Sequence, residues 1–320
     1  MIGYPAGGIS ANYAFAPGYP TLIRLMNLFA GNYLLSAALI SNFFSVLAVV
    51  VLYHIAKIYF SSTESLYASL AFLLFPTFVT YGLVSYSEPV YITFAMLAVY
   101  FFLKRRYFYF GITSSVAVLC SFINILIPIV FLSIILLSSF IPRLFGGKVL
   151  DSFSKGTEVL PKFGLAWLAA PLLTLGIWMY FLDVRSGIQN ALFVAQGPWG
   201  VALANPIAQL QSFFTGVLSK QGNPVQQLLM RYVYTLPFLA LVYPLWKVDR
   251  GLALYSFTFM LFVLSLVGVA YASGPRLMLS AWPITLVFGK LEKEYAFTVL
   301  VLFALVSLSS TYAQMTMFWT

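Results

Sequence analysis

Two charged residues stand beside prolines at the starts of apolar segments, and both have side chains suited to binding or activating a polar ligand. Glu88 lies in the sequence YSEP, directly before Pro89, and Arg276 follows SGP. A carboxylate in such a turn can bind a hydroxyl group or accept its proton, and the forked guanidinium of an arginine matches a phosphate group. Two simpler interpretations stay open. Glu88 can be a solvated turn or helix N-cap residue, and the stem of Arg276 can cover apolar surface while its head reaches water.

The chain offers few other groups for catalysis or metal binding. It contains one histidine and one cysteine, His54 and Cys120, and it has no GxGxxG, Walker, HExxH or paired-cysteine motif. A metal site, a histidine-dependent triad and an internal disulfide are therefore not expected. We predict no cofactor, and nothing in the sequence supports a divalent ion. Among the aromatic residues, Tyr86 and Trp199 are candidates for stacking on a sugar ring.

The scarcity of charge decides the class of protein. Only 8% of the residues are charged, 62% are hydrophobic, and the mean hydropathy is +0.95, whereas a water-soluble domain carries about 25% charged residues. Such a chain cannot cover its surface in water, so a lipid bilayer must be its solvent. The net charge is +9, and the basic residues that produce it lie between apolar runs. This is the pattern of membrane anchoring, and it excludes nucleic acid as the expected partner.

The apolar runs predict an all-α, polytopic bundle of about ten transmembrane helices. The predicted spans are 33–59, 65–83, 89–103, 108–121, 122–141, 163–182, 228–246, 251–271, 276–289 and 295–316. We treat residues 1–320 as one integral-membrane domain, with an outer loop and interfacial segment at 1–32 and a long outer loop at 183–227. Within the first of these, the amphipathic stretch 19–30 is expected to lie in the membrane interface.

Most of the 17 Lys and Arg residues fall in alternate connections between the predicted spans. By the positive-inside rule these connections are cytoplasmic, which predicts a multi-pass protein of the cell membrane with both termini outward. Glu88 and Arg276 then lie on the outer side. Five Lys and Arg residues fall on the outer side, against two acids, Glu88 and Asp183, and this excess of cations favours an anionic ligand headgroup.

Four segments together resemble the GPI mannosyltransferase 2 family and its prokaryotic relatives, integral-membrane glycosyltransferases of the GT-C class. They are YAFAPGYPTLIRL at 13–25, FPTFVTYGLVSYSEPVYITFAMLAVYFFLKRR at 75–106, FVAQGPWG at 193–200 with Pro206, and SGPRLMLSAWP at 273–283. The resemblance spans nearly the whole chain, and the order of the segments makes it more specific than any one of them.

The resemblance implies a GT-C-like fold and transfer of mannose, or a related hexose, from a polyprenyl-phosphate sugar to an unidentified glycan or lipid acceptor on the outer face. It assigns the catalytic position to Glu88. It assigns substrate binding to Arg276, Tyr86, Gln196 and Trp199.

Two departures from the family pattern lead to an alternative. The family's first outer loop carries an acid in a WDG…Y…GY context, but here only the trailing GY remains, as Gly3 and Tyr4, and no acid precedes Glu64. The family's TRP.G stretch reads SFINIL at 121–126. We therefore expect either a chain without the family's first helix or a catalytically inactive GT-C-fold membrane protein that binds or scaffolds. A transporter ranks third, because the charges lie at span ends and not at mid-membrane depth.

Overall fold

The structure is a computed structural model that describes residues 8, 10–83, 85–140, 164–199, 202–208, 211, 215, 237–267 and 276–318. Its helices are η1 (Ala11–Ala14), α1 (Gly18–Ala30), α2 (Tyr33–Ala56), α3 (Ser62–Leu73), α4 (Pro76–Leu83), α5 (Glu88–Leu103), α6 (Tyr107–Cys120), η2 (Phe122–Ile125), α7 (Leu126–Phe140), α9 (Gly164–Ser186), α10 (Ala191–Val194), η3 (Gly197–Trp199), a helix at Pro237–Val248, α13 (Arg250–Ser265), η4 (Met278–Lys290) and α15 (Lys293–Phe318). Two short strands, β1 (Ala202–Leu203) and β2 (Leu266–Val267), pair antiparallel. The predicted all-α class is confirmed.

Short polar residues set where several of these helices begin. The side chain of Asn32 accepts a hydrogen bond from the backbone N–H of Leu35 at the start of α2, and Asp249 does the same for Leu252 at the start of α13. Ser61 and Glu64 form a capping box that begins α3. These caps satisfy backbone donors that a helix end leaves without a partner, so they fix the ends of the apolar segments.

The helix boundaries follow most of the predicted spans, but the spans 65–83 and 122–141 each form two helices, and α13 ends at Ser265, inside the predicted span 251–271. The apolar run at 65–83, predicted as one span, forms the two helices α3 and α4. The break precedes Pro76, which has no N–H to donate and disfavours the helical conformation of the residue before it. Predicted segments 228–236, 268–275 and the basic connection 143–162 lie outside the described residues.

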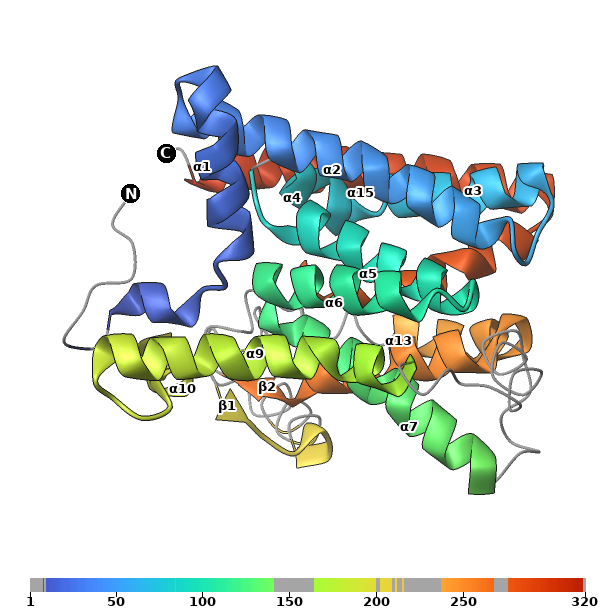
Figure 1. The fold of residues 1–320 in the computed structure, drawn as a ribbon. Helices are drawn as coiled ribbons and strands as arrows, with labels where there is room; N and C mark the ends of the chain where they lie inside the picture. Colours follow the sequence, from blue (N-terminus) through green and yellow to red (C-terminus); the bar gives the residue numbers. More distant parts are fainter. Residues whose placement is uncertain are drawn as a thin grey trace.

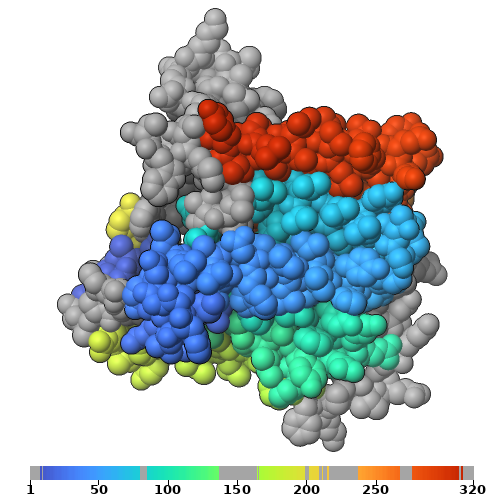
Figure 2. Space-filling view, turned by 90° about the horizontal axis from the view of Figure 1, so that it is seen from above, coloured from blue at the N-terminus to red at the C-terminus, as the bar shows by residue number. Residues whose placement is uncertain are grey.

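The outer surface of the bundle is apolar where helices face away from the core. Among the described residues, two helices are long and apolar enough to cross a membrane, Tyr33–Ala56 and Ala166–Ser186, and five shorter helices are also apolar. Figure 2 shows one face of the molecule, where α15 lies beside α3 and α4, and these lie beside α2. Among the exposed side chains, α2 contributes Leu34, Phe43 and Val46, and α15 contributes Leu305 and Leu308. Exposed apolar side chains of this kind fit contact with lipid chains.

The long helices run roughly parallel, with α5 central and packed on α2 and α6 (Figure 1). The contact between α13 and η4 is lined by large buried rings, among them Tyr255 and Trp282 with centroids 6.1 Å apart. By contrast, α1 crosses the ends of α2 and α6 (Figure 1). The position of 19–30 in the membrane interface stays a prediction.

Close packing of α6 on α9 depends on Gly111. A Cβ atom added there would lie 2.8 Å from the backbone oxygen of Trp167, whereas one added at Gly176 of α9 would meet nothing within 4 Å. We expect Gly111→Ala to destabilise the protein by about 1–3 kcal/mol, because overpacking moves backbone. Gly176→Ala should stabilise it by up to about 1 kcal/mol, because alanine is the better helix former. Thermal unfolding of the two purified variants in one detergent checks this, and equal melting temperatures would contradict it.

Candidate binding site at the start of α5

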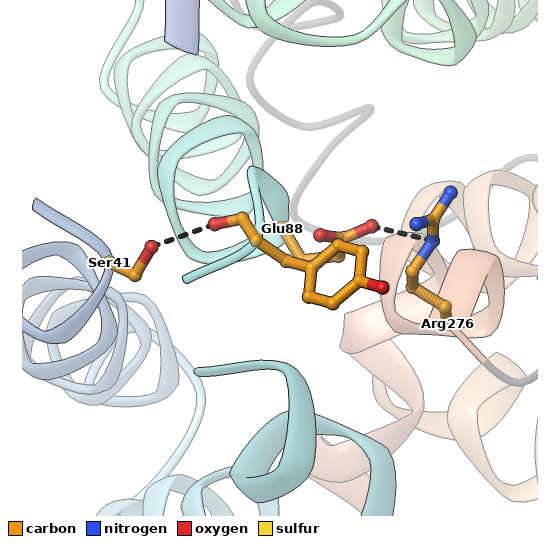
Figure 3. A network of polar contacts seen from close by, with 4 residues as sticks. Ser41, Glu88 and Arg276 are labelled. Atoms are coloured by element: carbon orange, nitrogen blue, oxygen red, sulfur yellow. Dashed lines mark hydrogen bonds and ion pairs between the residues drawn. The ribbon is translucent and has the colours of Figure 1, made fainter. Parts of the chain in front are cut away.

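The site is built on an ion pair between the first residue of α5 and a residue just before η4. Arg276 Nε lies 2.8 Å from Glu88 Oε1, and Figure 3 shows the two side chains pointing toward each other. The Glu88 side chain is 2% exposed, whereas that of Arg276 is 29% exposed. The buried carboxylate therefore anchors a guanidinium that a ligand can reach from the surface.

The ring of Tyr86 lies next to the same guanidinium. Arg276 Cζ is 5.3 Å from the centroid of the Tyr86 ring, within the range of a cation–π interaction. The two contacts hold the guanidinium between a carboxylate and an aromatic ring. The structure thus brings together three of the five predicted site residues, Glu88, Arg276 and Tyr86.

The backbone that precedes Glu88 is held by α1 and α2. The Tyr19 hydroxyl donates to the carbonyl oxygen of Ser85 at 2.6 Å, and the Ser41 hydroxyl donates to that of Tyr86 at 2.8 Å. Figure 3 shows Ser41 on the opposite side of Glu88 from Arg276. Neither Tyr19 nor Ser41 was predicted from the sequence as a site residue. Tyr19 belongs to the GYP of the first resembling segment, which was the available signal, whereas nothing distinguishes Ser41 from the other serines of its span.

No contact among the described residues joins the other two predicted residues to this ion pair. The Gln196 side chain donates to the backbone oxygen of Ala14 at 3.0 Å and so ties the segment after α10 to η1. Trp199 ends η3, but its side chain lies outside the part of the chain that the structure describes. Their predicted role in substrate binding stays a prediction.

Buried polar groups line the interior beside the Glu88–Arg276 pair. Tyr91 is one helical turn beyond Glu88 on α5, and Ser280 is four residues beyond Arg276. Glu88 Oε2 is buried without a hydrogen-bond partner among the described residues, and the buried hydroxyl groups of Tyr91 and Ser280 lie near each other. Buried polar atoms are normally hydrogen bonded, so this region favours further polar contacts. The sequence contained a signal for Tyr91, because residues three apart on a helix share a face.

Acidic and sulfur ligands do not gather at the site. Among the described residues, no group of three or more His, Cys, Asp or Glu side chains is placed to hold a metal ion. The chemistry available here is therefore that of one carboxylate, one guanidinium, aromatic rings and hydroxyl groups.

Comparison with known proteins identifies relatives of this architecture. Residues 15–149, less than half of the chain, match the family model described as dolichyl-phosphate-mannose-protein mannosyltransferase. A search of curated proteins finds no match.

ArnT and AglB are among the solved structures that resemble nearly the whole chain. ArnT from Cupriavidus metallidurans, bound to undecaprenyl phosphate, has a TM-score of 0.56 at 14% identity, covering 92% of this chain and 53% of ArnT. The oligosaccharyltransferase AglB from Archaeoglobus fulgidus, in complex with an inhibitory peptide and a dolichol-phosphate, has a TM-score of 0.51 at 12% identity, covering 94% of this chain and 47% of AglB. The chain thus spans about half the length of the solved proteins it matches.

These similarities show the fold, which is the GT-C-like all-α fold expected from the sequence. They support the predicted resemblance at the level of GT-C glycosyltransferases and do not single out the GPI mannosyltransferase 2 family.

Proposed function

We propose that this chain is a membrane glycosyltransferase that moves mannose or a related hexose from a polyprenyl-phosphate carrier to a hydroxyl acceptor. The observation that carries the proposal is the ion pair in which a buried Glu88 holds a partly exposed Arg276 at the end of a GT-C-like bundle. The matched family's description names a dolichyl-phosphate mannose donor, and the two solved relatives hold undecaprenyl phosphate and dolichol-phosphate. All three names share a polyprenyl-type phosphate.

Arg276 is proposed to bind the phosphate of the donor. When the acceptor hydroxyl attacks the anomeric carbon, the bond to the phosphate oxygen breaks and negative charge grows on the departing phosphate. A guanidinium fixed in place beforehand stabilises this charge without having to reorganise. Its anchoring by Glu88 and Tyr86 is well suited to that task.

Glu88 is proposed to serve first as the anchor of Arg276. The sequence-based prediction makes it the base that takes the acceptor proton, and a carboxylate is chemically suited to that role. With 2% of its side chain exposed, it reaches an acceptor hydroxyl only when the pair opens on substrate binding. Tyr86, Gln196 and Trp199 remain the proposed contacts for the sugar and acceptor.

The membrane arrangement belongs to the same proposal. We infer one integral-membrane domain over 1–320, an outward-facing site, and both termini outward, on the basis of the Lys and Arg distribution. The apolar outer faces of α2 and α15 support a position within lipid.

Reconstitution tests the proposed function directly. The purified chain in liposomes is incubated with polyprenyl-phosphate mannose labelled in the sugar, together with lipid and glycan acceptors, and products are separated from donor. Label transferred to an acceptor is the expected result, and Arg106→Ala, at the start of α6 and remote from the pair, is the matched control. Donor binding without transfer would favour the inactive GT-C-fold protein, and neither binding nor transfer would contradict the proposal.

A further inference from the structure

The segment 85–87, which leads into Glu88, is held in an unusual backbone conformation by side chains from two other helices. Ser85 has φ of 61°, in the left-handed region that non-glycine residues seldom adopt. Its carbonyl oxygen accepts from Tyr19 Oη, and the next carbonyl, of Tyr86, accepts from Ser41 Oγ. Because a strained conformation persists only where its surroundings enforce it, these two bonds are the visible restraints on the segment.

The two hydroxyl groups that hold this segment also contact each other. Tyr19 Oη and Ser41 Oγ are 2.8 Å apart, and Ser41 is fully buried. The pair of hydroxyls and the pair of carbonyls therefore form one connected unit that joins α1, α2 and the start of α5. Loss of the Tyr19 hydroxyl removes a contact to both other elements at once.

The first turn of α1 is docked tightly at this end of the bundle. A Cβ atom added at Gly18 would lie 2.6 Å from Cys120 Sγ and 2.7 Å from the backbone oxygen of Leu119, at the end of α6. Cys120 is free and only 4% exposed. The far end of the helix differs, because Leu28 and Phe29 are 75% and 87% exposed. One end of α1 thus packs on the bundle while the other presents apolar side chains to the surroundings.

We propose that Tyr19 is a positioning residue for the Glu88–Arg276 site, through which the docking of α1 fixes the 85–87 segment and hence the carboxylate that anchors Arg276. The inference rests on the proposed function for its catalytic consequence, whereas its structural part stands on the contacts alone. Tyr19 acts on Glu88 through the backbone of residues 85–87 and is not itself assigned a contact with substrate.

The single cysteine of the chain provides a native reporter for the docking of α1. In the wild-type protein, Cys120 should react slowly with N-ethylmaleimide, because Gly18 covers its thiol. In Tyr19→Phe the reaction should be about tenfold faster, since the variant loses the hydroxyl contacts to Ser85 O, Ser41 Oγ and Ala37 O, and hydrogen bonds are each modest in net stability. Two variants are the matched controls and should react like wild type. They are Tyr33→Phe, at an exposed tyrosine at the start of α2, and Ser45→Ala, whose hydroxyl donates within α2 to Ser41 O.

Hydrogen exchange and kinetics test whether docking controls the site. Tyr19→Phe and Ser41→Ala should each speed amide exchange at residues 85–91. The exchange rate of the double variant should be only slightly higher than that of either single variant. In the transfer assay, Tyr19→Phe should lower kcat about tenfold while the KM for the donor changes less than twofold, because one or two hydrogen bonds of positioning are lost and the residues that hold the donor are kept. A merely structural tyrosine would lower the yield of folded protein and leave kcat per folded molecule unchanged.

The outcomes separate this inference from the proposed function. Unchanged Cys120 reactivity in Tyr19→Phe would overturn it, and so would faster Cys120 reaction with wild-type exchange at 85–91. If the wild-type chain transfers no sugar, the proposed function fails, while labelling and exchange still decide whether Tyr19 holds the 85–87 segment. Faster labelling, faster exchange and a lower kcat, with both controls at wild-type values, would establish it.

Discussion

Replacing Arg276 by alanine is expected to lower sugar transfer by about 10²-fold or more, since one preorganised donor to a developing charge contributes about that much. The affinity for the polyprenyl-phosphate carrier should fall as well, because the guanidinium is the proposed phosphate ligand. Arg276→Lys should restore only part of the rate. Lysine keeps the positive charge but loses the planar fork and the Nε–H that faces Glu88 Oε1.

Steady-state kinetics with labelled donor measures the transfer rate. Equilibrium binding of the polyprenyl phosphate without its sugar measures the affinity for the carrier separately. Arg106→Ala serves as the control, since it removes an exposed arginine at the start of α6. Wild-type transfer by Arg276→Ala would remove this residue from the site. Loss of binding with an unchanged rate at saturating donor would assign Arg276 to uniform binding and not to the transition state.

The positions of helices along the chain were largely predictable from the sequence. The predicted spans 89–103 and 108–121 became α5 and α6 with ends shifted by about one residue, because long apolar runs bounded by charge leave little choice of boundary. The break between α3 and α4 was not predicted, because the span was drawn from the length of the apolar run. That length takes no account of the backbone N–H that Pro76 lacks.

The sequence predicted which end of the bundle carries the site, but it did not predict which residues are in contact there. Charge distribution orders residues along one axis, and it placed Glu88 and Arg276 at the same end without bringing them together. Their contact depends on how α5 packs laterally against η4, which no local pattern encodes. The contacts of Gln196 and Ser41 were not predictable for the same reason. The segment of Gln196 packs on η1 and α9, and Ser41 is a small residue within an apolar helix, like other serines of that helix.

A double replacement separates the structural from the chemical role of the Glu88–Arg276 pair. Arg276→Gln leaves a carboxylate that is 2% exposed without its charged partner, and breaking a buried pair in this way costs about 3–5 kcal/mol. Glu88→Gln should cost much less stability, because Arg276 is 29% exposed and water can solvate it. Replacing both by glutamine removes both charges, which is often neutral for a buried pair, so the double variant should melt close to the wild-type temperature.

Transfer should follow a different order. Glu88→Gln, Arg276→Gln and the double variant should each lose about 10²-fold or more of the wild-type rate, because the acid–base group or the charged donor, or both, are missing. The double variant is the informative one, since a protein that is as stable as wild type and still inactive has lost chemistry and not folding. Thermal unfolding in detergent gives the first quantity and labelled-donor transfer gives the second. Recovery of transfer together with stability in the double variant would mean that the pair only holds α5 against η4, and the acceptor base and phosphate ligand would have to be sought elsewhere on the chain.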